Sequence, residues 1–311
     1  MEPIICLVGP TASGKTRLAV ELAKALDGEV VSCDSMQLYR HMDVGTAKPT
    51  REEMQGVRHH MLDVCEPWED FSVGRYVPMA EACVQEILSR GKTVIVAGGT
   101  GLYADSLILG RTFAPVPSTG KRAQLEALAA AEGGEGLLLR LQKVDPARAE
   151  RLHPSDVRRI VRALEVYEET GKTITQHDLE TRAQPPRHEA LWLGLDFPER
   201  SRLYARIDRR VEQMLQSGLL DEIRGLLSFG VRADMTAMQA IGYKEYLAAL
   251  EGRCSLDEAT ALVQQRSRNY AKRQLTWFRR NERLRWLRWT EDENFSAIFE
   301  QALREIRFFA G

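Results

Sequence analysis

A glycine-rich segment near the N-terminus constrains the fold more than any other feature of the sequence. Residues 9–16 read Gly-Pro-Thr-Ala-Ser-Gly-Lys-Thr and match the pattern G-x-x-x-x-G-K-[ST]. The segment follows an apolar run at residues 3–8 and precedes a helical repeat of leucines at about residues 15–26. Between a strand and a helix, such a loop directs its backbone amides at phosphate oxygens, and the helix N-terminus adds positive charge. The motif therefore predicts a site for a diphosphate or triphosphate.

The motif assigns separate roles to its residues. Lys15 supplies a cation, and the hydroxyl of Thr16 can bind Mg²⁺. In an ordinary NTPase, a second apolar strand ends in an Asp that holds the metal, whereas the strand predicted at residues 92–97 ends in Gly-Gly-Thr. This favours a reaction in which diphosphate is the leaving group or the part of the substrate that the protein binds. It leaves open whether ATP or another nucleotide also binds. The candidate diphosphate or nucleotide ligands are Gly9, Pro10, Thr11, Ala12, Ser13, Gly14, Lys15 and Thr16.

Strands and helices alternate along the first part of the chain. Apolar runs at residues 3–8, 29–33 and 92–97 predict strands, and helices are expected at about residues 15–26 and 77–90. This alternation predicts an α/β fold, in which a parallel sheet is covered by helices on both faces.

The pattern changes after about residue 114. Residues 114–118 and 184–187 are rich in proline and look like hinges. We expect a P-loop α/β core made of residues 1–114 and 189–311, with a helical insertion domain at residues 115–188. Within the insertion, Asp145-Pro146 predicts a helix start, and another helix is expected between Pro154 and Gly171. Beyond it we expect strands at 191–195 and 284–289 and a helical C-terminal part at about 199–217, 219–229, 240–250, 256–281 and 296–309.

An aspartate follows the second predicted strand. Because the C-terminal ends of parallel strands line one crevice, Asp34, Thr100 and the 9–16 loop should open onto the same place. A carboxylate beside bound diphosphate would be repelled unless it binds Mg²⁺ or accepts a proton. The alternative is that Asp34 only caps the next turn. The irregular stretch at residues 34–75 that it begins is long, as functional loops often are.

Several segments, in order along nearly the whole chain, carry a resemblance. The longest is residues 34–49, Asp-Ser-Met-Gln-Leu-Tyr-Arg-His-Met-Asp-Val-Gly-Thr-Ala-Lys-Pro. Together these segments resemble bacterial tRNA dimethylallyltransferases, also called tRNA isopentenyltransferases. The segments are residues 9–16, 34–49, 98–103, 158–165, 206–207, 239–245 and 270–278.

The resemblance implies an activity and assigns residues to it. The activity is transfer of a dimethylallyl group from dimethylallyl diphosphate to N6 of the adenosine 3′ of the tRNA anticodon (position 37). The 9–16 loop would hold the diphosphate with Mg²⁺, Asp34 would be the general base, and Thr100 and Arg206 would steady the leaving diphosphate. The resemblance implies tRNA contacts by Asp34, Ser35, Met36, Gln37, Thr100, Arg122, Arg158, Arg159, Ile160, Val161 and Arg162.

A cationic segment near the C-terminus independently favours an RNA partner. Residues 266–288 hold nine Arg or Lys, four aromatic residues and a single acid, Glu282. Cations contact phosphates, and aromatic planes stack on unpaired bases. The alternative, a solvated and salt-bridged helix, is favoured instead for residues 158–162, which have glutamates nearby. The candidate RNA contacts, at helical spacing on one face, are Arg266, Arg273, Trp277 and Arg280, with Tyr270 between them.

Composition adds expectations about location and partners. The formal net charge of −1 gives no overall sign of a polyanion partner, and no apolar run approaches the length of a membrane span. The five cysteines form no C-x-x-C pair, which fits a reducing cytoplasm. His59 and His60 have no third ligand nearby, so packing or hydrogen bonding is expected rather than metal binding. We expect a cytoplasmic monomer with no membrane partner.

Two other functions fit the glycine-rich motif. A P-loop kinase acting on a small molecule would use the same loop, and the arginine-rich insertion could be its lid. It does not explain the cationic, aromatic segment at residues 266–288. A non-catalytic RNA-binding protein with a nucleotide switch would explain that segment, but it gives no reason for Asp34 at the end of a strand.

Overall fold

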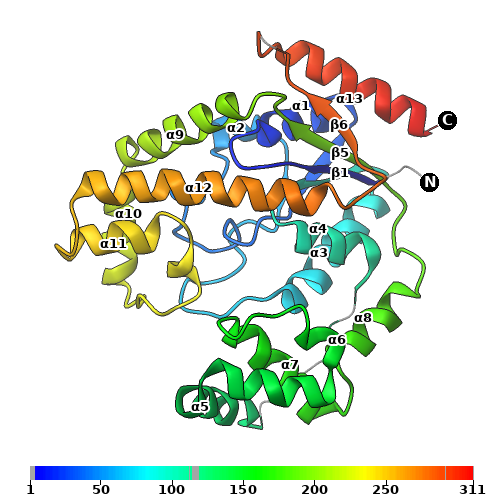
Figure 1. Cartoon of the computed structure of the whole chain (residues 1–311). Coiled ribbons are helices and arrows are strands. Elements are labelled where there is room, and N and C mark those ends of the chain that lie inside the picture. Colours follow the sequence, from blue (N-terminus) through cyan, green and yellow to red (C-terminus); the bar gives the residue numbers. More distant parts are fainter. Residues whose placement is uncertain (1–3, 112, 114–118, 291, 311) are drawn as a thin grey trace. The chain divides into compact units, whose positions relative to one another are not determined.

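The computed structural model describes residues 4–111, 113, 119–290 and 292–310 (Figure 1). The chain forms two compact units, which we call the core unit (Met1–Gly110 with Arg187–Gly311) and the insertion unit (Arg111–Pro186). The first expected hinge, at residues 114–118, lies outside the described residues. The second expected hinge, at residues 184–187, includes the point where the chain returns to the core unit.

The core unit is built on a sheet of six parallel strands in the order β3-β2-β4-β1-β5-β6. In the middle, Val8 pairs with Gly98 on one side and with Gly194 on the other, so the C-terminal ends of three strands lie side by side. The predicted parallel α/β fold is confirmed. The strands are β1 (Ile4–Val8), β2 (Gly28–Ser32), β3 (His59–His60), β4 (Thr93–Gly98), β5 (Ala190–Asp196) and β6 (Arg285–Arg288).

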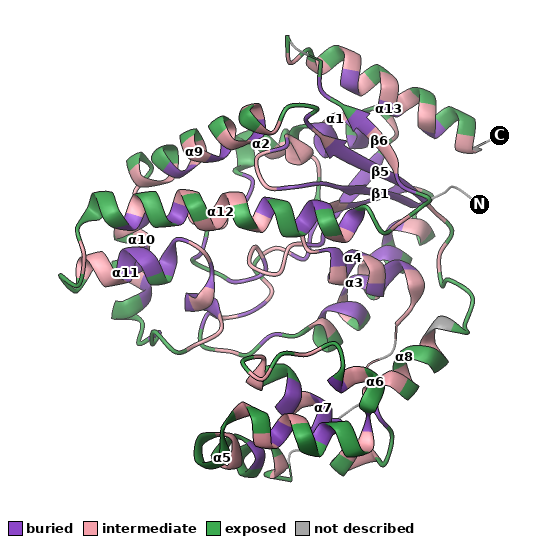
Figure 2. Ribbon diagram, in the orientation of Figure 1, coloured by how far each residue is buried: buried purple, intermediate pink, exposed green. Residues whose placement is uncertain are grey.

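Helices cover both faces of this sheet, so its central strands are buried (Figure 2). On one face, Leu18 and Leu22 of α1, Leu203 of α9 and Ile298 of α13 join the strand side chains in one apolar cluster. The other face is covered by α3 and α4, whose Tyr76 and Tyr103 rings stack at 4.3 Å. The helices of the core unit are α1 (Lys15–Ala25), α2 (Arg51–Met54), α3 (Val73–Ser89), α4 (Gly101–Leu109), α9 (Arg200–Gln216), α10 (Leu219–Ser228), α11 (Tyr243–Leu250), α12 (Leu256–Phe278) and α13 (Phe295–Ala310).

The stretch at residues 34–75 is less irregular than its sequence suggests. It contains the short helix α2 and the edge strand β3, which pairs with β2 through Val30 and Val31. Nε2 of His60 lies 2.7 Å from a carboxylate oxygen of Glu29, which is a hydrogen-bonding role. No cluster of three His, Cys, Asp or Glu side chains suited to a metal ion occurs within the described part of the chain.

The insertion unit has its own small core, which includes Leu137, Leu141, Ile160 and Leu164. The predicted helix start at Asp145-Pro146 is confirmed, since Oδ1 of Asp145 accepts the backbone N–H of Arg148 at 3.2 Å. The helix expected before Gly171 is also present. The helices of this unit are α5 (Lys121–Val144), α6 (Pro146–Ala149), α7 (Val157–Thr170) and α8 (Ile174–Arg182).

Candidate functional site

The 9–16 loop connects β1 to the N-terminus of α1. Gly9 and Gly14 have φ angles of 154° and 92°, which residues with a side chain rarely adopt. A Cβ at Gly9 would also lie only 2.8 Å from the carbonyl oxygen of Leu195. Both glycines are therefore needed for the chain to turn tightly between the strand and the helix.

Side chains that are distant in the sequence donate hydrogen bonds to backbone carbonyls of the loop. The indole N–H of Trp289 donates to the carbonyl of Ser13 at 2.9 Å, and Nε of Arg206 donates to that of Ala12 at 3.0 Å. The hydroxyl of Ser13 is fully buried and has no hydrogen-bond partner among the described residues. A buried hydroxyl without a partner is costly, so its presence fits an anion bound inside the loop.

Lys15 begins α1 and folds back over the loop. Its ammonium group donates to the carbonyl oxygen of Pro10 at 2.7 Å. Burial lowers the pKa of Lys15 to about 8, and the nearby positive charge of Arg210 adds to the decrease, while the carboxylate of Asp34 opposes it. A dianionic ligand in the loop would stabilise the charged form of this lysine.

The pKa of Lys15 predicts that binding of inorganic diphosphate weakens in alkaline solution. Lys15 keeps its charge below about pH 8 and loses it as the pH rises through that value. Affinity should therefore fall by up to about tenfold for each pH unit above the pKa. Isothermal titration calorimetry across this range measures the effect. The Lys15→Met protein should lack it, and an equal pH dependence in that variant would assign the titration to another group.

Two arginines of α9 lie at the loop, although the sequence pointed only to Arg206. One turn later, Nη1 of Arg210 donates to the hydroxyl of Thr11 at 3.3 Å. Burial lowers the pKa of Arg210, and the carboxylate of Asp34 partly offsets this. Arg210 is therefore close to both the loop and the candidate base. The spacing of four residues from Arg206 was the signal in the sequence that could have revealed it.

Replacing Arg210 by glutamine is expected to weaken diphosphate binding about ten- to a hundredfold, because one half-buried cation at the loop is lost. The neighbouring Arg209 is exposed on the same helix and provides a matched control. Titration calorimetry of Arg210→Gln and Arg209→Gln with inorganic diphosphate compares the two. Equal affinities for both variants would remove Arg210 from the site.

Asp34 follows β2 and lies near both Lys15 and Arg210. Its Oδ1 accepts the backbone N–H of Met36 at 2.9 Å, so the carboxylate does cap the next turn. Its Oδ2 lies toward Gly99, 3.8 Å from where a Cβ of that residue would stand. One carboxylate can therefore fix its own turn with one oxygen and present the other to a substrate.

Thr100 follows β4 and forms hydrogen bonds with the segment that follows β2. Its hydroxyl oxygen accepts the backbone N–H of Ser35 at 3.0 Å and lies 3.3 Å from the hydroxyl of Ser35. Asp34, Thr100 and the 9–16 loop thus lie at one edge of the sheet, as the topology of parallel strands requires. This arrangement brings a carboxylate, two arginines and a lysine to the edge where an anion-binding loop opens.

The sequence is similar to those of known proteins over nearly its whole length. A family model described as IPP transferase matches residues 37–281. The chain belongs to the IPP transferase family. It is 44% identical over 310 residues to the tRNA dimethylallyltransferase of Acetivibrio thermocellus, with 99% of this chain and 97% of the relative covered. It is 47% identical over 306 residues to that of Geobacillus thermodenitrificans, with coverages of 98% and 96%.

Solved structures of IPP transferases resemble the chain over nearly its whole length. The tRNA isopentenylpyrophosphate transferase of Bacillus halodurans has a TM-score of 0.72 and 40% identity, covering 99% of this chain and 97% of that one. A eukaryotic dimethylallyltransferase described as acting on tRNA has a TM-score of 0.82 and 28% identity, with coverages of 97% and 78%. No helix in the described part of the chain is both long and apolar enough to cross a membrane.

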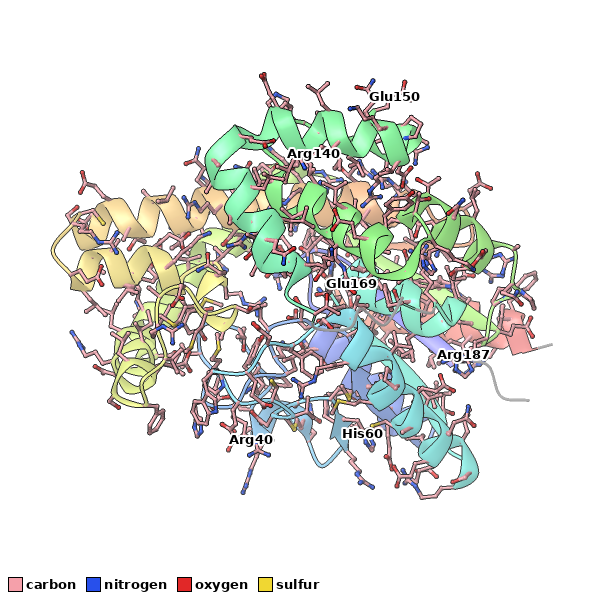
Figure 3. The ribbon with its side chains drawn as sticks, turned by 90° about the horizontal axis from the view of Figure 1, so that it is seen from below. Arg40, His60, Arg140, Glu150, Glu169 and Arg187 are labelled. Atoms are coloured by element: carbon pink, nitrogen blue, oxygen red, sulfur yellow. The ribbon has the colours of Figure 1, made fainter. Side chains whose placement is uncertain are left out.

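The segment at residues 34–49 of this IPP transferase is held in a fixed shape. Nε2 of Gln37 donates to the carbonyl of Ala47 at 3.1 Å, which closes the segment on itself. The carboxylate of Glu222 accepts the backbone amides of Asp43 and Val44, each at 2.7 Å. Ser35, Met36 and Gln37 are consequently half-buried in an ordered loop beside Asp34. Arg40 extends outward from this loop (Figure 3).

The cationic face predicted on α12 separates into two kinds of residue. Arg273 on α12 and Arg280, just beyond the end of that helix at Phe278, are exposed, with their guanidinium groups over the rings of Tyr270 and Trp277 at 5.6 and 5.9 Å. Arg266 instead pairs with the buried carboxylate of Glu245. The indole N–H of Trp277 donates to Asp105 at 2.9 Å, and its ring packs against Gly101.

The tRNA contacts expected in the insertion unit also differ among themselves. Arg158 and Arg159 are exposed on α7, whereas Ile160 and Val161 are 0% and 1% exposed. Because each residue of a helix is rotated by about 100° from the last, the side chains of Ile160 and Val161 face the core of this unit, and their expected contact with RNA stays a prediction. Arg162 pairs with Glu165 at 2.9 Å.

Acidic side chains are interspersed with these arginines. Nε of Arg122 lies 3.1 Å from a carboxylate oxygen of Glu126 in the same helix. The two signs of charge are mixed over the insertion unit, where Arg140, Glu150 and Glu169 are labelled (Figure 3). Arg159 lies 3.9 Å from the carboxylate of Asp156, but its side chain is 69% exposed, so Arg158 and Arg159 are the stronger candidates for phosphate contacts in this unit.

Proposed function

We propose that this chain is a tRNA dimethylallyltransferase. It transfers the dimethylallyl group of dimethylallyl diphosphate to N6 of the adenosine 3′ of the anticodon (position 37) and releases diphosphate. The observation that carries the proposal is the position of Asp34 and Thr100 beside an anion-binding loop. Relatives with this activity in their names match nearly the whole chain, which supports it.

The donor's diphosphate binds in the 9–16 loop. Backbone amides of the loop, together with Lys15, Arg206 and Arg210, stabilise the negative charge that grows on the diphosphate as it leaves. Mg²⁺ fits the half-buried hydroxyl of Thr16 at the start of α1, since this metal is usually held by one or two protein oxygens and substrate phosphates. When bound, the metal supplies further positive charge against the diphosphate.

The acceptor amine needs both a strong electrophile and a base. The lone pair of an adenine amine is delocalised into the ring, so N6 attacks only a carbon with considerable cationic character. As the N6–C bond forms and the C–O bond to diphosphate breaks, N6 becomes positively charged, and Asp34 takes its proton. Water must be kept away from the allylic carbon, which it would otherwise capture.

The tRNA reaches this site with its target base turned out of the anticodon loop. A stacked base cannot approach a buried carbon, so the nucleotide must be flipped. We assign phosphate contacts to Arg158, Arg159, Arg273 and Arg280, which are exposed. The five cysteines are free thiols, and the expected cytoplasmic location stays a prediction. The expected monomeric state stays a prediction.

One assay separates this function from its two alternatives. The protein is incubated with labelled dimethylallyl diphosphate, γ-labelled ATP, Mg²⁺ and unmodified tRNA. Transfer of the prenyl label to tRNA is the expected result. Transfer of the phosphate label to a small molecule would indicate a kinase, and tRNA binding without transfer of either label would indicate a binding protein.

A further inference from the structure

The side-chain amide of Gln274 lies between the two loops of the proposed site. Gln274 belongs to α12 and is only 5% exposed. Its Oε1 accepts the backbone N–H of Thr11 at 2.9 Å, and its Nε2 donates to the carbonyl of Gly99 at 2.9 Å. A single buried side chain thus connects backbone segments that are far apart in the sequence.

Both ends of the amide are used, and only one orientation satisfies them. A backbone N–H requires the oxygen of the amide, and a carbonyl requires its NH₂ group. A flipped amide would place donor against donor and acceptor against acceptor. The bond to Gly99 is buried and the bond to Thr11 is partly buried, so losing either partner would leave a costly unpaired backbone group. The amide therefore fixes the distance between Thr11 and Gly99.

The segments that contain Thr11 and Gly99 each contact a residue of the proposed active site. Thr11 belongs to the 9–16 loop, and its hydroxyl accepts from Arg210 at 3.3 Å. Gly99 precedes Thr100, which holds the backbone N–H of Ser35 next to Asp34. Gly99 and Gln274 are in close contact, since a Cβ at Gly99 would lie 2.3 Å from Nε2 of Gln274.

We propose that Gln274 is a positioning residue for the transfer reaction, fixing the diphosphate loop at the correct distance from Asp34. This inference rests on the proposed function. The leaving group and the base act on opposite sides of one reacting carbon–nitrogen pair, so their separation must be held closely. A misplacement of about 1 Å in such a geometry can cost on the order of a hundredfold in rate.

A purely structural role for Gln274 makes a different prediction. Its neighbours on the buried side of α12 are Ala271, Leu275 and Phe278, and an apolar side chain there would extend that packing. If Gln274 only supported the fold, replacing it would change stability and all activities together. A positioning role instead predicts that binding of the diphosphate and the rate of transfer respond separately.

The test compares Gln274→Met and Gln274→Glu with Gln265→Met, an exposed position on the same helix. For each protein, titration calorimetry gives the affinity for inorganic diphosphate. Labelled dimethylallyl diphosphate with tRNA gives kcat, and the products show how much donor ends on tRNA and how much as the free alcohol. For Gln274→Met we expect diphosphate affinity within about threefold of the parent, kcat about a hundredfold lower, and a larger share of alcohol.

The pH dependence of the transfer rate of Gln274→Glu distinguishes the two roles more directly. An ionised glutamate still accepts the N–H of Thr11, but it repels the carbonyl of Gly99. A protonated glutamate donates to that carbonyl again. The rate of Gln274→Glu relative to the parent protein should therefore recover as the pH falls. This profile decides the matter if Gln274→Met does not fold.

Two outcomes would overturn the proposal. One is transfer by Gln274→Met at nearly the parental rate. The other is a parallel loss of diphosphate affinity and kcat in both variants, with a flat relative pH profile for Gln274→Glu. Failure of the proposed function is distinguishable from both, because the parent protein itself would then put no prenyl label on tRNA.

Discussion

Replacing Asp34 by asparagine is expected to lower the rate of dimethylallyl transfer by about 10²- to 10⁴-fold, the usual contribution of a general base. Asparagine keeps a side-chain oxygen for the backbone N–H of Met36, which Asp34 accepts at 2.9 Å, so the turn should survive. The substitution removes the negative charge of the side chain and with it the capacity to take a proton from N6. Single-turnover transfer of labelled dimethylallyl groups to tRNA measures the effect.

Two further measurements separate chemistry from binding in this variant. Affinities for tRNA and for inorganic diphosphate should stay within about threefold of the parent, because neither contact requires proton transfer. Asp257→Asn, at an exposed position in the first turn of α12, is the matched control and should transfer normally. Retention of most of the rate by Asp34→Asn would show that the carboxylate is only a turn cap.

Replacing Lys15 by methionine is expected to weaken binding of dimethylallyl diphosphate and to lower kcat/KM by about 10²- to 10³-fold, as for other preorganised donors to a developing anion. Methionine retains much of the apolar stem and removes the ammonium group that lies 2.7 Å from the carbonyl of Pro10. Steady-state kinetics with varied donor, together with calorimetry using inorganic diphosphate, measure the two effects.

Lys24→Met is the control for this second substitution. Lys24 lies on the same helix but is exposed near its far end. It should leave donor affinity unchanged, and Lys15→Met should leave tRNA affinity unchanged. Donor affinity that is equal in the two variants would place the diphosphate outside the 9–16 loop.

The parallel sheet was predictable because its strands carry their own signal. Central strands buried on both faces are expected to be nearly continuously apolar, as residues 4–8 and 94–97 are. The loop between β1 and α1 was predictable because its glycines and lysine stand at fixed spacing. Once the strands were placed, topology alone brought Asp34 and Thr100 to the same edge of the sheet.

Other parts of the site were not predictable from local pattern. The strand β3 is only two residues long, and its pairing with β2 depends on chain that lies far away in the sequence. Gln274 stands within a cationic segment, and nothing in that segment shows that its amide meets Thr11 and Gly99. By contrast, helical periodicity does place the side chains of Ile160 and Val161 in the core of the insertion unit, and only the resemblance pointed to RNA contact there.

The most direct test of the account is a crystal structure of the protein with a non-hydrolysable thiolodiphosphate analogue of the donor and an unmodified anticodon stem-loop. We predict that the diphosphate lies within residues 9–16, with N6 of the flipped adenine about 3 Å from a carboxylate oxygen of Asp34. A complex in which that loop holds no phosphate and the prenyl chain lies elsewhere would contradict the account.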